Sequence, residues 1–142
     1  MKCDGRDVLP QIRAVIDTNV LYSGLTHRGI PFRIVQAGQA GRFTWIFSNP
    51  IIAEYVDLFS RKNLMELIHP SLSWLKRNGV RVDVPDFLPD MFTEITDVDD
   101  RPIFAAAYVA GAIFVTGDRH HFPWSSYKSI RIMPPADFYD IL

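Results

Sequence analysis

The sequence predicts an α/β fold, a three-layer sandwich with helices on both faces of a mainly parallel central sheet. Two short apolar runs, residues 13–16 and 112–116, have the composition of buried strands. Between them, strand-like segments alternate with segments of helical periodicity. This alternation is typical of parallel strands, because each parallel pair needs a long connection that is usually a helix.

The first third of the chain is expected to form one strand and two helices. The strand over residues 13–16 ends abruptly at Asp17, and a helix over residues 18–25 follows it. A loop then leads to Pro31, which can open a helix toward Gly38, because proline fits the first turn of a helix.

The middle of the chain is expected to add a strand and the helix that follows it. Residues 43–47 are rich in β-forming side chains and predict a strand. Ser48-Asn49-Pro50 then provides a helix start, with proline near the first turn, for a helix over residues 51–60. Residues 63–68 can add another turn or two.

The next stretch is expected to hold a separate short helix, a strand and a loop. A helix over residues 70–76 should stop at Asn78-Gly79. The alternating pattern of residues 80–84 predicts a strand. Residues 85–96 contain two prolines and are expected to be mostly loop.

The last third returns to the alternating pattern. A helix is expected to begin near Asp100 and to end at Ala110, before Gly111. The buried strand over residues 112–116 follows, and residues 130–133 predict a final strand. Pro134-Pro135 then precedes a short terminal helix.

Length and composition favour one folded domain over residues 1–142. The chain is 48% hydrophobic and 22% charged, which argues against disorder. No apolar run approaches the roughly 20 residues of a membrane helix, and the first residues do not resemble a signal peptide. The single cysteine, Cys3, excludes an internal disulfide and fits a cytoplasmic location. The net charge of −1 neither indicates nor excludes a nucleic-acid partner.

Two aspartates follow the two most strand-like segments. Asp17 directly follows the first strand, and Asp118 follows the strand over residues 112–116. Ligands of open α/β sheets bind beyond the carboxyl ends of the strands, so both carboxylates should lie at one edge. Each aspartate alone could equally be a helix cap.

Glu54 is expected to join them from the helix over residues 51–60. It shares a helical stripe with Ile51, Tyr55 and Leu58, which are apolar or aromatic. A carboxylate on a buried face must be paired, protonated or bound to a metal. A simple ion pair to an arginine is the alternative.

The acidic run Asp97-Val98-Asp99-Asp100 precedes the helix that leads into the Asp118 strand. Asp100 lies closest to the helix start and is the preferred site residue. Asp99 is the reserve candidate for a metal ligand, whereas Asp97 is expected to be structural. One member of the run is expected to be an ordinary helix N-cap and another to be solvated surface.

The collected carboxylates predict a divalent-metal site. Carboxylates gathered in one pocket repel one another unless a cation neutralises them. Oxygen ligands in this number select Mg²⁺ or Mn²⁺ over zinc. His120 and His121 lack a partner at ligand spacing and are expected to be ordinary loop residues, which disfavours zinc.

Five segments together resemble the PIN-domain nucleases. These segments are Asp17-Thr18-Asn19-Val20-Leu21, the helix with Glu54, the helix that begins at Asp100, Val115-Thr116-Gly117-Asp118-Arg119, and Pro134-Pro135-Ala136-Asp137-Phe138. Within this family the sequence is similar to the VapC-related toxins of toxin–antitoxin pairs. The resemblance implies a PIN-like fold and a metal-dependent endoribonuclease that cuts RNA. It also implies a homodimer and a small antitoxin protein as partner.

If the chain is a nuclease of this kind, each polar residue near the strand ends has an expected role. Asp17, Glu54, Asp100 and Asp118 would hold one or two Mg²⁺ or Mn²⁺ ions, directly or through water. Thr18 would bind the attacking water or a phosphate oxygen, and Asn19 would orient Asp17, although both could cap the first helix instead. Arg119 and Arg101 would contact phosphates or balance nearby carboxylates.

Two alternatives stay open at this stage. One is a PIN-like module that binds nucleic acid without cutting it. The other is a Mg²⁺-dependent receiver domain of a signalling system, which also gathers acids at strand ends. A receiver is expected to carry a functional lysine on a late strand, and residues 130–133 contain none.

Overall fold

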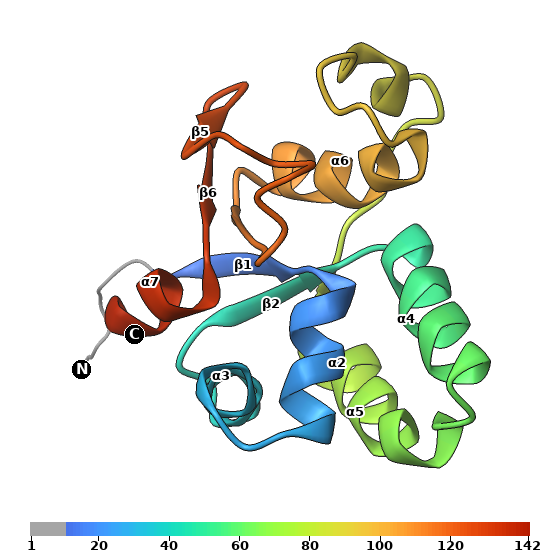
Figure 1. Ribbon diagram of the computed structural model, residues 1–142, viewed down its shortest axis with the longest axis vertical. Helices are drawn as coiled ribbons and strands as arrows, with labels where there is room; N and C mark the ends of the chain where they lie inside the picture. The colour runs from blue at the N-terminus through green and yellow to red at the C-terminus, as the bar shows by residue number, and fades with distance from the viewer. Residues whose placement is uncertain (1–10) are drawn as a thin grey trace.

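The computed structural model describes residues 11–142, which build a six-stranded sheet with helices on both faces (Figure 1). The sheet order is β3-β2-β1-β4-β6-β5. The strands are β1 (Arg13–Ile16), β2 (Thr44–Phe47), β3 (Val80–Arg81), β4 (Ile113–Val115), β5 (Ser126–Tyr127) and β6 (Ile130–Met133). The predicted α/β class with a mainly parallel sheet is confirmed. Cys3 lies outside the described residues.

The two strands with the strongest sequence signal form the centre of the sheet. β1 pairs in parallel with both β2 and β4, and Ile16 lies opposite Val115. The side chains of β1 are almost fully buried after Arg13, as expected for a strand covered on both faces. The residues that follow β1 and β4 therefore emerge side by side at the same edge.

Six α-helices of residues 11–142 surround this sheet. They are α2 (Thr18–Thr26), α3 (Ile30–Gln39), α4 (Asn49–Arg61), α5 (Met65–Asn78), α6 (Arg101–Ala110) and α7 (Pro135–Asp140). Helices α2 to α5 pack together on one side, whereas α6 lies across the other (Figure 1). None of the helices in this part of the chain is both long and apolar enough to cross a membrane.

The aromatic core under α6 holds this helix against the sheet. Phe104 of α6 packs edge-on against Phe114 of β4 at 5.8 Å and against Phe92 at 5.1 Å, measured between ring centroids. Phe122, from the loop after β4, lies 4.9 Å from Phe114. Aromatic pairs in this geometry add to the stabilisation that burial alone provides. This packing fixes the start of α6, which carries Asp100.

The structure corrects the predicted helix boundaries between residues 63 and 76. The expected extra turn and the expected separate helix are one continuous helix, α5, with Pro70 inside it. Pro70 is exposed, so the carbonyl that loses its N–H partner can be hydrated on the solvent side. The break that proline predicts is therefore absent here.

The structure also corrects the strands at both edges of the sheet. The expected strand over residues 80–84 is paired only at Val80–Arg81, because its neighbour β2 ends at Phe47. Ser126–Tyr127 forms an unpredicted antiparallel edge strand beside β6. A two-residue strand is too short to give an alternating sequence pattern. The 3₁₀ turn η1 (Leu88–Met91) interrupts the expected loop over residues 85–96, and a second one, η2 (Val98–Asp100), directly precedes α6.

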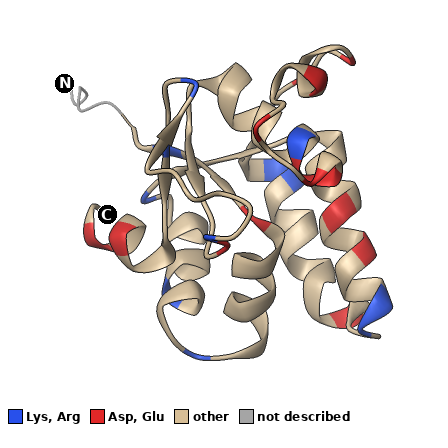
Figure 2. Ribbon diagram, turned by 45° about the horizontal axis from the view of Figure 1, so that its top comes forward, with Lys and Arg blue, Asp and Glu red and all other residues tan. Residues whose placement is uncertain are grey.

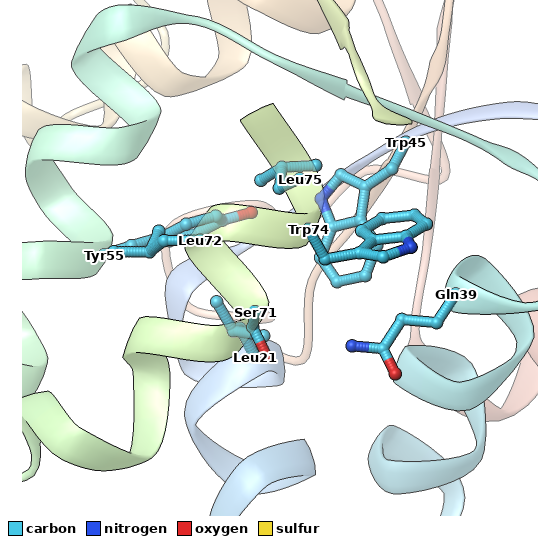
Figure 3. A pocket seen from close by; sticks show the side chains of 8 residues that line it. All are labelled: Leu21, Gln39, Trp45, Tyr55, Ser71, Leu72, Trp74 and Leu75. Atoms are coloured by element: carbon cyan, nitrogen blue, oxygen red, sulfur yellow. The ribbon is translucent and has the colours of Figure 1, made fainter. Parts of the chain in front are cut away.

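A small cavity lies inside the core between α2, α3, β2, α4 and α5 (Figure 3). Its volume of about 10 Å³ leaves room for no more than one water molecule. Trp45 Nε1, on its wall, is the only buried side-chain N or O atom without a hydrogen-bond partner in residues 11–142. The eight residues that line the cavity are Leu21, Gln39, Trp45, Tyr55, Ser71, Leu72, Trp74 and Leu75. The cavity is too small to be a substrate site.

Candidate metal centre

Asp17 is held in a fixed orientation at the carboxyl end of β1. Its Oδ1 accepts a hydrogen bond from the backbone N–H of Thr18 at 2.8 Å, so Asp17 is also the N-cap of α2. Its Oδ2 accepts from the Thr116 hydroxyl at 2.7 Å. Asp17 is 8% exposed, and burial raises the pKa of its carboxyl group to about 6, although the bonds from Thr116 and Thr18 oppose that rise. Asp17 therefore caps α2 and also lies buried at the carboxyl end of β1.

Thr116 connects the acids of β1 and β4. It is fully buried, donates to Asp17, and its hydroxyl oxygen accepts from the backbone N–H of Asp118 at 3.1 Å. One side chain thus sets the position of both strand-end aspartates. Thr116 has no separate signal in the sequence, although it follows β4, where a buried hydroxyl needs partners.

We expect Thr116→Val to lower the free energy of unfolding by about 1–3 kcal/mol, because Asp17 loses a hydrogen-bond donor and Asp118 N–H loses an acceptor. Urea unfolding measures this change. Thr44→Val, at the opposite end of the sheet, is the matched control. A Thr116→Val protein as stable as the control would show that Thr116 does not support the site.

Glu54 reaches the same edge from α4. Its Oε1 accepts a hydrogen bond from the Thr18 hydroxyl at 2.6 Å, and its side chain is half-buried. One residue further along α4, the buried hydroxyl of Tyr55 donates to the carbonyl oxygen of Ile16, the last residue of β1. This bond fixes α4 to the end of β1. Glu54 and Asp17 therefore reach the same edge from different elements, and the Tyr55 bond joins those elements beside them.

Asp100 completes the acidic edge from the start of α6. It is the N-cap residue of α6, yet its side chain makes no capping hydrogen bond. Burial raises its pKa to about 7, and the negative charges of Asp97, Asp17 and Glu54 add to this rise. A carboxyl group with so high a pKa lies where a nearby cation would stabilise its charged form.

The other members of the acidic run have different environments. The Asp97 carboxylate caps η2 by accepting from the backbone N–H of Asp99 at 3.0 Å, as the structural interpretation of Asp97 predicts. Asp99 is exposed, and its carboxylate makes no hydrogen bond or ion pair with any described residue. The geometry therefore favours Asp100 over Asp99 as the member of the acidic run that joins Asp17, Glu54 and Asp118.

Asp118 pairs with His121, which was expected from the sequence to be an ordinary loop residue. Its Oδ2 lies 2.6 Å from His121 Nδ1, and its Oδ1 accepts from the backbone N–H groups of His120 and His121, each at 3.0 Å. Partial burial of Asp118 acts to raise its pKa, but the bonds from His121 outweigh it and lower the pKa. The bond to Asp118 in turn raises the pKa of His121.

His121 corrects the interpretation of the pair His120-His121. Its Nδ1 lies 3.9 Å from Asp100 Oδ2, so it faces both aspartates. Ligand atoms of Asp100, Asp118 and His121 all lie within 4.8 Å of one another, which is a grouping that can hold a metal ion. The signal in the sequence was the three-residue spacing from Asp118, which brings a side chain back over the same turn.

The arrangement suits a divalent cation better than a set of ion pairs. No lysine or arginine in residues 11–142 forms a salt bridge with Asp17, Glu54, Asp100 or Asp118. Figure 2 shows acidic positions, in red, near the centre of the view between the strands and the helices. A cation would offset the burial of Asp17 and Asp100 and also the repulsion that adds to the raised pKa of Asp100. A cluster of acids and one histidine able to bind a divalent metal is therefore present.

The three predicted substrate-binding residues lie in different surroundings. Asn19 is exposed on the first turn of α2, and no hydrogen bond between described residues joins it to Asp17. Arg101 donates from Nε to the carbonyl oxygen of Ile95 at 2.8 Å, which holds it against the preceding loop. Arg119 is exposed beside Asp118 and makes no ion pair within residues 11–142.

Comparison with known proteins supports the resemblance found in the sequence. The PIN-domain family profile matches residues 13–120, from β1 to just beyond β4. This range includes Asp17, Glu54, Asp100 and Asp118. Among curated proteins, no relative matches the chain significantly.

Two similar solved structures share the fold at low sequence identity. One is VapBC2 from Rickettsia felis bound to a DNA fragment from its promoter, with a TM-score of 0.63 and 16% identity over 87% of this chain and 98% of that one. The other is a toxin–antitoxin complex from Klebsiella pneumoniae, with a TM-score of 0.62 and 16% identity over 86% of this chain and 97% of that one. At this identity the likeness establishes the fold.

Proposed function

The chain belongs to the PIN-domain family, and on that premise we propose that it is a divalent-metal-dependent endoribonuclease, the toxin component of a toxin–antitoxin pair. The observation that carries this proposal is the convergence of acids from three elements and one loop at a single edge of the sheet. The two similar complexes described above favour the toxin role, because both are toxin–antitoxin assemblies.

The proposed cofactor is Mg²⁺ or Mn²⁺, held by Asp17, Glu54, Asp100 and Asp118. When bound, such an ion lowers the pKa of a coordinated water and stabilises negative charge on a phosphate. His121 adds a nitrogen donor to Asp100 and Asp118. One imidazole among four carboxylates leaves the donor set mostly oxygen, which suits Mg²⁺ and Mn²⁺. Asp99 is the reserve ligand in this proposal.

The proposed reaction is hydrolysis, in which a water oxygen bonds to phosphorus and the bond from phosphorus to a sugar oxygen breaks. The Thr18 hydroxyl donates to Glu54 and keeps its lone pairs available, so it can accept a hydrogen bond from the attacking water. Thr116 bonds both Asp17 and the backbone of Asp118, so the two carboxylates stay at the same edge of the sheet. The chain thus positions the attacking water and supplies the negative charge that binds the cation.

The proposed substrate contacts come from the rim of the cluster. Arg119 is exposed next to Asp118 and is free to meet a phosphate of RNA. Asn19 faces solvent at the start of α2 and can contact the same strand. Arg101 is held by loop carbonyls, so its contribution to phosphate binding is limited to its remaining N–H groups. A homodimer, a small antitoxin and a cytoplasmic location complete the proposal.

We expect the chain to cut a mixed pool of single-stranded RNA in Mn²⁺ and to leave the same pool intact in EDTA. The measurement is sequencing of the cut ends, with single-stranded DNA of the same sequences as comparison. RNA binding is measured in parallel. Binding without cleavage in Mn²⁺ or Mg²⁺ would replace the nuclease with the binding-scaffold alternative. Phosphate labelling by a small phosphodonor would instead favour the receiver alternative.

A further inference from the structure

Residues 83–100, between β3 and α6, form a lobe that stands beyond α6 at the top of Figure 1; it is called the acidic lobe below. Its inward side is anchored by Leu88, Phe92 and Ile95, which are 8%, 1% and 0% exposed. The Phe92 ring lies 5.3 Å from that of Tyr108 on α6 and packs edge-on against it. The acidic lobe is therefore a packed part of the fold, with a defined outer surface.

The outer surface of the acidic lobe carries large apolar side chains. Phe87, Met91 and Val98 are 62%, 58% and 61% exposed, the three highest values for large hydrophobic residues in the described part of the chain. Apolar side chains left this exposed cost free energy in water, and three of them within one short segment favour a surface that a partner covers. The packing of the inner residues does not require these three to be apolar.

The charge of the acidic lobe is one-sided. Seven of the sixteen acidic residues of the chain lie in residues 83–100, and this segment has no lysine or arginine. Figure 2 shows the same asymmetry, with acidic positions and no basic ones on the projecting segment. Asp86 and Asp90, next to Phe87 and Met91, are exposed and form no ion pair with the described residues.

The exposed apolar side chains and the negative charge together indicate which kind of molecule can bind the acidic lobe. A nucleic acid is repelled, because the acidic lobe and a phosphate backbone carry charge of the same sign. A second copy of the chain has a net charge of −1 and presents the same acidic surface. A segment with apolar side chains on one face and lysine or arginine around them complements both features. Helices of this kind commonly bind through a few apolar anchors.

We propose that the acidic lobe is the docking surface for a positively charged amphipathic segment of a partner protein. Phe87, Met91 and Val98 are the apolar contacts, and Asp86 and Asp90 attract the basic side chains. Asp100 is the last residue of the acidic lobe, so an occupied lobe lies beside the candidate metal centre. This docking surface does not depend on nuclease activity, because its readout is protein binding without RNA.

The test uses the full chain and a synthetic amphipathic helix of leucine and lysine, labelled with a fluorophore, as the probe. We expect the double variant Phe87→Ser, Met91→Ser to bind the peptide about tenfold more weakly. Asp86→Asn, Asp90→Asn should weaken binding severalfold and flatten its dependence on salt. The control double variant Leu67→Ser, Val109→Ser, which removes exposed apolar groups elsewhere, should bind as the unaltered chain does.

Three results would overturn the proposal. The first is that the unaltered chain does not bind the basic peptide, and the second is that it binds a leucine–glutamate peptide equally well. The third is that the lobe variant binds as the control variant does. Sedimentation of all variants tests whether a second copy of the chain is the occupant instead. Self-association lost only in the lobe variant would assign this surface to that second copy. Thermal unfolding verifies that each variant is folded.

Discussion

Asp17→Asn is expected to reduce Mn²⁺-dependent cleavage of RNA by about 100-fold or more while the protein stays folded. The substitution removes one negative charge from the centre of the cluster and keeps the shape of the side chain. The remaining amide oxygen can still accept from Thr18 N–H, and the Thr116 hydroxyl can turn to accept from the new amide. The loss is therefore one of charge.

The same variant should be more stable than the unaltered chain in the absence of metal. Burial raises the pKa of Asp17 in the folded protein to about 6 from 3.8, so the charged carboxylate opposes folding. The folded state binds more protons between these values, so stability falls as the pH rises through this interval and stays low above it. At pH 7 the asparagine variant escapes a penalty on the order of 1–3 kcal/mol.

The control is Asp57→Asn, which removes an exposed carboxylate from α4 that is paired with Arg61. Cleavage should be unaffected in this variant. Urea unfolding in EDTA measures the stability of both. If Asp17→Asn kept its metal-dependent cleavage, or lost it only because the protein unfolded, Asp17 would not act through its charge at the metal.

Asp100→Asn is expected to remove most of the stabilisation that Mn²⁺ gives to the protein. A ligand present at 100 times its Kd stabilises the folded state by about 2.7 kcal/mol, which corresponds to a rise in Tm of several degrees for a chain of this size. Asp100 lies within reach of Asp118 and His121, so its loss should weaken binding of the ion. Thermal unfolding with increasing Mn²⁺ measures this difference.

The pH dependence in EDTA gives a second measurement on the same variant. Burial and neighbouring carboxylates raise the pKa of Asp100 to about 7, so the unaltered chain loses stability as the pH rises from about 4 to 7. The raised pKa of His121 gives a further loss of the same sign above its ordinary value of 6.5. The asparagine variant should therefore show a shallower fall, with a higher Tm than the unaltered chain at pH 8 and a similar Tm at pH 4.

Asp99→Asn is the matched control, because Asp99 is adjacent, acidic and exposed. It should respond to Mn²⁺ and to pH as the unaltered chain does. The reverse outcome, in which Asp99→Asn loses the Mn²⁺ effect and Asp100→Asn keeps it, would move the third acid of the site to Asp99.

The central part of the fold is predictable because its local signals agree with its environment. β1 and β4 are buried on both faces, and continuous apolar sequence is the expected pattern there. The edge strands are less predictable, since β3 and β5 have only two residues each and depend on their neighbours for pairing. Helix α5 continues through Pro70 because Pro70 lies on the side of the helix that faces solvent. The sequence alone did not predict which side that would be.

The acids of the candidate site were predictable for a similar reason. Asp17 and Asp118 follow central strands, and Glu54 interrupts an apolar face, so each stands out locally. Thr116 and His121 were missed, because their importance comes from distances across the fold. The Thr116 hydroxyl bonds a residue 99 positions away in the chain, and His121 faces Asp100 only after the loop beyond β4 has turned back.

The central claim is that Asp17, Glu54, Asp100 and Asp118 surround one divalent-metal centre. Crystals of the unaltered chain grown with Mn²⁺, measured for manganese anomalous scattering, test it most directly. The account predicts an anomalous peak at the carboxyl edge of β1 and β4, about 2–2.5 Å from carboxylate oxygens of Asp100 and Asp118. Manganese peaks only at other acidic positions, with these four carboxylates free of metal, would contradict it.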